Sequence, residues 1–354
     1  MDIKDLLQLT IDSKAGDLHI ISGSPPILRI EGELKPVDKA GVLTPELVQG
    51  FLKSILTAEQ FDRFLVNKEI DFSLSFSEKA RFRVNAYTQK GTPAVAFRKI
   101  PLEVPTIDSL GLPKILHSFT SLRQGFILVT GPTGHGKSTT LASVLGEINA
   151  TRATHIVTIE DPIEFVFRPN KSIISQREMK SDTHSWPIAL RSVLREDPDV
   201  VLVGEMRDYE TIAAALTVAE TGHLVFATLH TNSAAQTIDR IVDVFPDEQQ
   251  SQVRLQLSNV IEAVFSQRLL PGVDKNRVVA YETMLGTSAI KTAIREGKTH
   301  QIDSIIQTSL EAGMSTLERS LARLVTDGKV SMEVAQSWSL RPEELSRLIK
   351  GATV

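Results

Sequence analysis

The sequence predicts an α/β protein in which a small α+β domain precedes a larger domain built on a parallel sheet. Two patterns predict this organisation. In the first hundred residues, apolar side chains alternate with polar ones, as in strands that bury one face. Farther along, wholly apolar runs alternate with helical patterns, as in parallel strands covered by helices on both faces. We expect an N-terminal domain at residues 1–100, a linker at 101–113, a core at 114–270 and a helical C-terminal region at 271–354.

The N-terminal domain is expected to contain short strands and a capped helix. Thr57 and Gln60 have the spacing of a capping box, so a helix should begin there. Arg83 and Arg98 occupy polar positions of alternating strand patterns, so both side chains should face solvent. The predicted strands cover residues 17–21, 27–30, 70–76, 82–86 and 94–100.

The core domain follows a segment rich in proline and glycine, which marks the linker. After this segment, short apolar runs alternate with stretches of helical periodicity, so strands and helices should alternate as well. The predicted strands cover residues 126–130, 155–159, 200–203 and 223–228, and the predicted helices cover 138–149, 188–195, 211–219 and a segment that begins at Ala234. In the C-terminal region, Met314, Leu317, Leu321 and Leu324 have the spacing of one buried helical face.

The composition excludes several classes of function. The chain has 354 residues with 39 basic and 43 acidic side chains, which gives a net charge of −4. Proteins that coat nucleic-acid backbones are usually basic, so we expect no nucleic-acid partner. The absence of cysteine excludes disulfides, thiol nucleophiles and cysteine-ligated zinc, and it suits a reducing cytoplasm. No apolar run reaches the length of about 18 residues that indicates a transmembrane segment, and the N-terminus shows no signal peptide.

A glycine-rich motif after the first core strand indicates a nucleotide site. It matches G-x-x-x-x-G-K-[ST] and lies between a predicted strand and a predicted helix. Backbone N–H groups would cradle phosphates, Lys137 would reach the β- and γ-phosphates, and Ser138 would ligate Mg²⁺. The expected ATP-binding residues are Gly131, Pro132, Thr133, Gly134, His135, Gly136, Lys137, Ser138 and Thr139. The Asn-Lys-x-Asp motif of guanine-specific proteins is missing, so GTP is not supported as the nucleotide.

Acidic residues follow two of the predicted strands. Glu205 comes just after the third core strand, where a carboxylate can deprotonate water, although Gly204 replaces the aspartate that usually precedes it. Glu160, Asp161 and Glu164 crowd into the loop after the second core strand, where they suit metal or water positioning or else form a solvated loop. We expect Glu205 and Glu164 to be catalytic and Glu160 and Asp161 to assist Ser138 at a magnesium ion.

Two histidines flank the fourth core strand. His230 falls just past its carboxyl end, at the sheet edge where the phosphates should lie. An imidazole in that place can contact the γ-phosphate, so His230 is a further candidate catalytic residue. His223 lies at the start of the strand, where a structural role is expected.

These motifs resemble the secretion-type ATPase family, which includes the motors of type II secretion and of type IV pili. Four blocks carry the resemblance in the expected order: the glycine-rich loop at 131–139, an acidic box at 159–164, the block from Asp197 to Asp208 and a histidine box at 222–231. The resemblance implies a PAS-like N-terminal domain and a RecA-like ATPase domain. It also implies a ring-shaped homohexamer in the cytoplasm, peripheral at the inner membrane, at the base of a pilus machine.

The resemblance also implies roles for single residues. Glu205 corresponds to the catalytic glutamate of the family, and Arg83 and Arg98 correspond to arginines that reach the nucleotide phosphates from the N-terminal domain. ATP and Mg²⁺ are the implied cofactors. The implied partners are an inner-membrane pilus platform protein and further copies of the chain.

The retraction branch of the family fits this sequence. Pilus extension and type II secretion ATPases carry a longer N-terminal extension and usually a four-cysteine zinc element, whereas this chain has no cysteine. A C-terminal block of the retraction ATPases is kept at five of eight positions in residues 289–296, with Lys291 in place of its first arginine. The expected function is therefore pilus retraction in twitching motility. An accessory retraction ATPase, assembled with a paralogous one, stays open as the alternative.

Two other interpretations are weaker. A RecA-like DNA translocase would share the ATPase domain, but the net charge of −4 and the lack of a Lys/Arg run argue against it. A ring subunit that binds ATP without hydrolysing it is disfavoured by the intact Lys137, Ser138, Glu205 and His230. His135 departs from the small residue that the family usually has at its position, and its imidazole either alters phosphate release or points outward.

Overall fold

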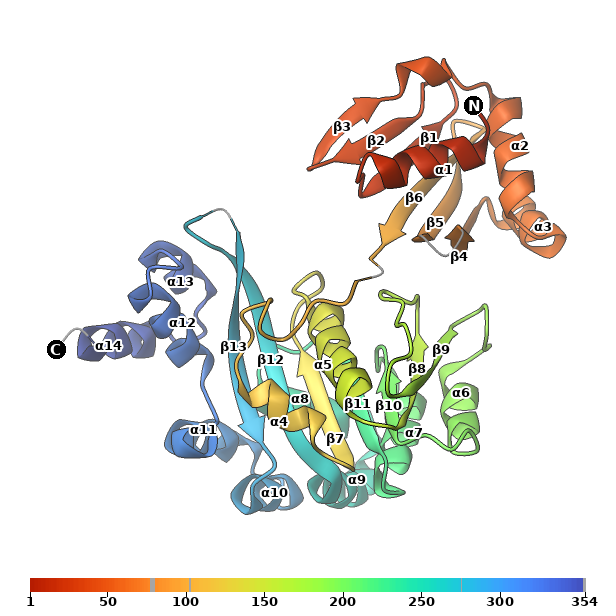
Figure 1. Cartoon of the computed structure of the whole chain (residues 1–354). Helices are drawn as coiled ribbons and strands as arrows, with labels where there is room; N and C mark the ends of the chain where they lie inside the picture. Colours follow the sequence, from red (N-terminus) through yellow and green to blue (C-terminus); the bar gives the residue numbers. More distant parts are fainter. Residues whose placement is uncertain (77–79, 102, 275, 353–354) are drawn as a thin grey trace. The chain divides into compact units, whose positions relative to one another are not determined.

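The computed structural model describes residues 1–76, 80–101, 103–274 and 276–352 (Figure 1). It divides into two compact units. Unit 1 comprises Met1–Glu103 together with Glu164–Phe167, and unit 2 comprises Val104–Ile163 and the chain from Arg168 onward. The division after Glu103 falls inside the segment 101–113, and no sequence pattern indicated that residues 164–167 would group with the first unit.

Unit 1 contains a six-stranded antiparallel sheet in the order β3-β2-β1-β6-β5-β4 (Figure 1). The described elements of this unit are α1 (Ile3–Asp12), β1 (Asp17–Ile21), β2 (Ile27–Ile30), β3 (Glu33–Pro36), η1 (Asp38–Ala40), α2 (Pro45–Ile55), α3 (Ala58–Asn67), β4 (Glu69–Phe76), β5 (Ala80–Gln89) and β6 (Thr92–Ile100). The predicted capping box starts α3, because Thr57 Oγ1 accepts the N–H of Gln60 and the Gln60 side chain accepts the N–H of Thr57.

The strands of unit 1 bury one face, as their alternating pattern predicts. Phe82 of β5 and Phe97 of β6 are fully buried and meet edge to face, with ring centroids 6.3 Å apart. Arg83 and Arg98 lie opposite each other in the β5–β6 register and are exposed, as expected. Arg98 pairs with Asp17 of β1 at 2.7 Å.

Unit 2 contains a seven-stranded sheet in the order β13-β12-β7-β11-β10-β8-β9, in which only β13 runs antiparallel to its neighbour (Figure 1). Its described elements are α4 (Ile115–Thr120), β7 (Gly125–Thr130), α5 (Lys137–Thr151), β8 (His155–Glu160), β9 (Ile173–Glu178), α6 (Trp186–Val193), β10 (Val200–Val203), α7 (Tyr209–Glu220), β11 (Leu224–Leu229), α8 (Ala234–Asp243), α9 (Asp247–Val260), β12 (Ile261–Pro271), β13 (Arg277–Leu285), α10 (Ser288–Arg295), η3 (Thr299–Gln301), α11 (Ile302–Thr308), η4 (Leu310–Ala312), α12 (Leu317–Thr326), α13 (Met332–Trp338) and α14 (Pro342–Ala352).

The four predicted core strands are present as β7, β8, β10 and β11, whereas β9, β12 and β13 were not predicted. The prediction that the chain is mostly helical from residue 271 was wrong for β13 and holds only beyond Leu285. Strand β12 is buried along most of its length, so only an apolar run could have marked it in the sequence. The polar residues Ser266, Gln267 and Arg268 interrupt that run, although all three are buried.

Helices α12, α13 and α14 form a core of their own beside β13 (Figure 1), whereas α10 and α11 pack into the main core of unit 2. Leu317, Leu321 and Leu324 are buried on one face of α12, and Met314 is buried just before that helix begins. The α/β class with an α+β N-terminal domain and a helical end is thus confirmed. Among the described residues, no helix is both long enough and apolar enough to cross a membrane.

Candidate active site

The glycine-rich loop joins the carboxyl end of β7 to α5 and lies against β12. Gly131 has φ +141°, and a Cβ there would collide with the carbonyl oxygen of Gln267 in β12. Gly136 has φ +83° and serves as the N-cap of α5. Glycine is therefore required at position 131 for the close approach of two backbones, and it suits position 136 because that residue is left-handed.

The first turn of α5 has the features of a phosphate cradle. The N-cap Gly136 supplies no side-chain hydrogen bond to α5, whereas Asp208 and Ser233 cap α7 and α8 in the ordinary way. The N-terminal N–H groups of α5 are thus not satisfied by a capping side chain, and the helix dipole adds positive potential there. With Lys137 beside them, these groups fit a nucleotide phosphate.

Lys137 is buried and is held by three acceptors. Its Nζ donates to the carbonyl oxygens of Gly131 at 2.9 Å and Pro132 at 3.0 Å, and it lies 3.3 Å from Nδ1 of His230. Burial lowers the pKa of Lys137, and the nearby Glu205 carboxylate opposes that effect. The ammonium group is therefore positioned at the loop before any phosphate arrives.

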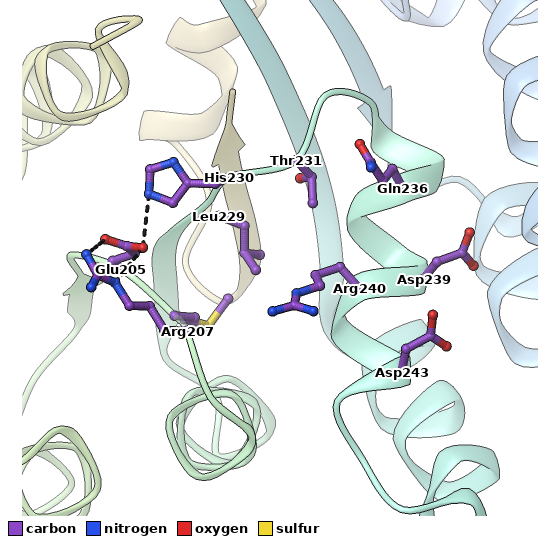
Figure 2. Close-up of a pocket in the computed structure, with 10 residues that line it drawn as sticks. Glu205, Arg207, Leu229, His230, Thr231, Gln236, Asp239, Arg240 and Asp243 are labelled. Atoms are coloured by element: carbon purple, nitrogen blue, oxygen red, sulfur yellow. Dashed lines mark hydrogen bonds and ion pairs between the residues drawn. The ribbon is translucent and has the colours of Figure 1, made fainter. Parts of the chain in front are cut away.

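His230 contacts Lys137 of the glycine-rich loop on one side and Glu205 on the other, and Figure 2 shows the contact to Glu205. A lysine ammonium only donates, so His230 Nδ1 must accept from Lys137, and the ring proton lies on Nε2. This Nε2–H donates to Glu205 Oε1 at 2.9 Å. Three residues from three different segments therefore form one hydrogen-bonded chain at the carboxyl edge of the sheet, which we call the Lys137–His230–Glu205 chain.

Glu205 is held on its other side by Arg207. Arg207 Nη2 donates to Glu205 Oε2 at 2.7 Å (Figure 2). Burial acts to raise the pKa of Glu205, but the hydrogen bond and the positive charge of Arg207, together with the charge of Lys137, outweigh it, so the pKa is lowered. Glu205 is thus a carboxylate at neutral pH and can accept a proton.

A cavity of about 560 Å³ opens beside this carboxylate (Figure 2). Glu205, Arg207 and His230 line one side of the cavity, and Asp239 and Arg240 of α8 lie on another. The catalytic candidates from the ends of β10 and β11 therefore face one space. Sequence reasoning missed the contribution of Arg207, although the arginine stands only two residues after Glu205.

The acidic box is divided by the fold. Glu160 is buried at the end of β8 and accepts hydrogen bonds from Thr158 Oγ1 at 2.6 Å and Gln176 Nε2 at 3.3 Å. Asp161 is exposed and lies 3.9 Å from Lys180. Glu164 falls in the segment that groups with unit 1.

The metal prediction is only partly represented in the geometry. Within the part of the chain that the structure describes, no group of three or more His, Asp or Glu side chains could hold a metal ion. Mg²⁺ at a nucleotide is usually bound through one or two protein groups and the phosphates. Ser138 is exposed at the start of α5, and its role at the metal stays a prediction.

His223, at the start of the fourth core strand, contacts the end of α7. His223 is half-buried, and its Nδ1 lies 3.0 Å from Thr221 Oγ1 and 3.1 Å from the carbonyl oxygen of Val218. It therefore ties the end of α7 to the start of β11, away from the carboxyl edge of the sheet.

The sheet, the glycine-rich loop and the Lys137–His230–Glu205 chain define a P-loop ATPase. A family model described as "Type II/IV secretion system protein" matches residues 2–300, and the chain belongs to this family. It is 47% identical over 346 residues to the type IV pilus retraction ATPase PilT of Pseudomonas aeruginosa, with 97% of this chain and 99% of that protein covered. The type IV pilus ATPase PilU of the same organism is 36% identical over 351 residues, with 99% and 92% covered. A crystal structure of the pilus retraction motor PilT with bound ADP matches with a TM-score of 0.92 and 45% identity over 98% of this chain and 99% of that one.

Proposed function

We propose that this protein is a motor ATPase that powers pilus retraction and thereby twitching motility. The observation that carries the ATPase assignment is the Lys137–His230–Glu205 chain, because it joins the phosphate loop to an ionised carboxylate beside a cavity. The retraction assignment is supported by the identity to PilT, which is 47% against 36% for PilU. The accessory role is therefore the second candidate.

The residues of unit 2 divide the work of hydrolysis. The N–H groups of the loop and of the first turn of α5 bind phosphate oxygens, and Lys137 offsets their negative charge. Glu205 accepts the proton of the attacking water, and His230 and Arg207 hold its two oxygens in place. Ser138, assisted by Glu160 and Asp161, would hold Mg²⁺, which neutralises charge on the phosphates when bound.

Residues outside this cluster act from other parts of the assembly. Arg83 and Arg98 are exposed on unit 1 and would stabilise phosphate charge, with Arg98 exchanging its partner Asp17 for the nucleotide. Glu164 would assist in water positioning. A closed ring needs one heterologous interface repeated around an axis, and we propose a homohexamer of this kind. We place the ring in the cytoplasm, against a platform protein of the inner membrane, with no nucleic-acid partner.

The segment 289–296 is a candidate surface for coupling to that platform. Ile290, Ala293 and Ile294 are buried on one face of α10, so the exposed Arg295 is free to meet a partner without disturbing the core. Lys291 is half-buried and pairs with Glu262 of β12 at 3.0 Å. Arg295→Ala is therefore the cleaner probe of this surface, with Lys350→Ala as an exposed basic control on α14.

The decisive test is a deletion strain complemented with the parental gene or with the Lys137→Ala variant. Cells that lack the gene should be hyperpiliated and unable to twitch, and the parental gene should restore motility where Lys137→Ala does not. Bald cells would indicate an extension motor instead, and unchanged twitching would favour the accessory role. Salt-sensitive DNA binding in a filter assay would revive the translocase interpretation.

A further inference from the structure

In the part of the chain that the structure describes, the side chain of His135 in the glycine-rich loop contacts both strand β12 and the C-terminal helix α13. Its Nδ1 accepts the N–H of Leu269 in β12 at 3.0 Å. Its carbonyl oxygen accepts from Gln267 Nε2 at 2.7 Å. Its ring centroid lies 5.4 Å from that of Trp338, at an interplanar angle of 57°. The imidazole thus points into unit 2 and not outward.

Strand β12 carries contacts to the loop and to α13 in turn. Gln267 and Leu269 bond to His135, and Gln267 Oε1 also accepts from Thr140 Oγ1 at 2.7 Å. Between them, Arg268 Nη1 donates to the carbonyl oxygen of Trp338 at 2.7 Å. Three consecutive residues of one strand therefore hold the phosphate loop and the end of α13 together.

The far side of Trp338 is also tied down. Glu318 of α12 is 1% exposed, and its Oε1 accepts the N–H groups of Leu340 at 3.1 Å and Arg341 at 3.0 Å. The residues that follow α13 are thus fixed to α12. The segment from Trp338 to Arg341 is bonded to β12 through Arg268 and to α12 through Glu318. A change in the position of Trp338 therefore has to involve the packing of these helices.

We propose that His135 is a positioning residue that couples the phosphate loop to Trp338, so that nucleotide in the loop and the setting of the C-terminal helices influence each other. The inference rests on the proposed function only in that the loop binds nucleotide. Coupling of this kind is reciprocal, because a contact that differs between two states of the loop favours one state of Trp338 and the reverse. A small residue at position 135 could make neither the ring contact nor the bond to Leu269.

The coupling requires a neutral imidazole, since a protonated Nδ1 cannot accept from Leu269. Burial lowers the pKa of His135, and the positive charges of Lys137, Arg268 and Arg277 lower it further. These three groups face it from α5, β12 and β13, and α13 presents Trp338, which does not titrate. Histidine at this site is therefore neutral at pH 7 and gains its proton only below its ordinary pKa of about 6.5.

The first test follows the fluorescence of Trp338 in a Trp186→Phe background, in which Trp338 is the remaining tryptophan. ADP should change the emission with a midpoint equal to the dissociation constant measured by calorimetry. His135→Ser should abolish this change and weaken ADP binding by about 3–10-fold, the effect of one net hydrogen bond. An undiminished response in His135→Ser would overturn the inference. If the background variant does not fold, ¹⁹F NMR of fluorotryptophan-labelled protein distinguishes the two indoles.

The same experiment separates the inference from the proposed function. If the protein that retains His135 binds ADP and the fluorescence of Trp338 does not change, the coupling is overturned and the ATPase assignment stands. Absence of ADP binding overturns both. Trp338→Phe is the matched control for ring packing, because it keeps an aromatic partner for His135; it should bind ADP more tightly than Trp338→Ala, and equal affinities would contradict the ring contact.

The second test uses pH. The KM for ATP of the parent should rise below pH 6.5 as His135 gains a proton and releases Leu269. His135→Asn places an amide oxygen near the position of Nδ1, so it can accept the same N–H without titrating. The KM of His135→Asn for ATP should lack that rise. If His135 is merely structural, the KM of the parent and that of the variant depend on pH in the same way, and this result would contradict the positioning role.

Discussion

Glu282 offers a quantitative test of how unit 2 is held together. This residue of β13 is 4% exposed, and its Oε1 accepts the N–H of Ala234, the first residue of α8, at 2.7 Å. Helix α8 begins shortly after His230, so Glu282 anchors the segment that follows the active-site histidine. The perturbation is Glu282→Gln, which keeps an acceptor oxygen for Ala234 and removes the ionisable group.

The magnitude follows from the pKa of the carboxyl. Burial raises the pKa of Glu282 from 4.5 to about 7, with Asp303 and Glu318 acting in the same direction and the Ala234 bond opposing them. Each pKa unit corresponds to about 1.36 kcal/mol, so ionising this group in the folded protein costs about 3 kcal/mol. The pKa of Glu282 is higher in the folded protein than in the unfolded chain. The protonated carboxyl therefore contributes its full free energy of folding below pH 4.5, and this contribution is lost as the pH rises towards 7.

The assay compares urea unfolding of unit 2 in the parent and in Glu282→Gln at pH 5 and pH 8. The free energy of unfolding of the variant, relative to the parent, should improve by about 2–3 kcal/mol between the two pH values, since only the parent must ionise a buried carboxyl. Using the difference between two proteins cancels the titration of all other groups. A relative stability that does not change with pH would refute the reasoning and mean that Glu282 is ionised without penalty.

Three further changes have defined outcomes. Glu205→Gln should lower ATP turnover by about 10²–10⁴-fold while ADP affinity in calorimetry persists, and turnover at the parental rate would place the base elsewhere. Gly131→Ala should destabilise unit 2 by about 1–3 kcal/mol in urea unfolding, because its Cβ meets the β12 backbone, whereas Gly134→Ala, with nothing within 4 Å, should cost less. Arg98→Ala should reduce turnover more than ATP affinity in steady-state kinetics, and an equal loss in Arg29→Ala, which shares the same aspartate partner, would assign the effect to unit 1 structure.

The sequence by itself determined the features that depend on neighbours along the chain. The strand–glycine-rich loop–helix order places Lys137 at a helix start, and a carboxylate just after an apolar run places Glu205 at the edge of the sheet. The capping box of α3 and the alternation of β4 and β5 are equally local. Such signals can be read in advance, because backbone geometry at 2.0 or 3.6 residues per period links residues only a few positions apart.

Only the tertiary structure decided how distant segments meet. Lys137 and His230 are 93 residues apart and His135 and Leu269 are 134 apart, yet each pair shares a hydrogen bond. Strand β12 was not predicted, because the polar residues Ser266, Gln267 and Arg268 interrupt its apolar run and only the fold shows that they are buried. The buried Gln267 donates to the carbonyl oxygen of His135, which lies 132 residues earlier in the chain. The partner of a polar side chain depends on which strands lie side by side in the sheet. Periodicity along the chain does not determine that order, because it relates only residues a few positions apart.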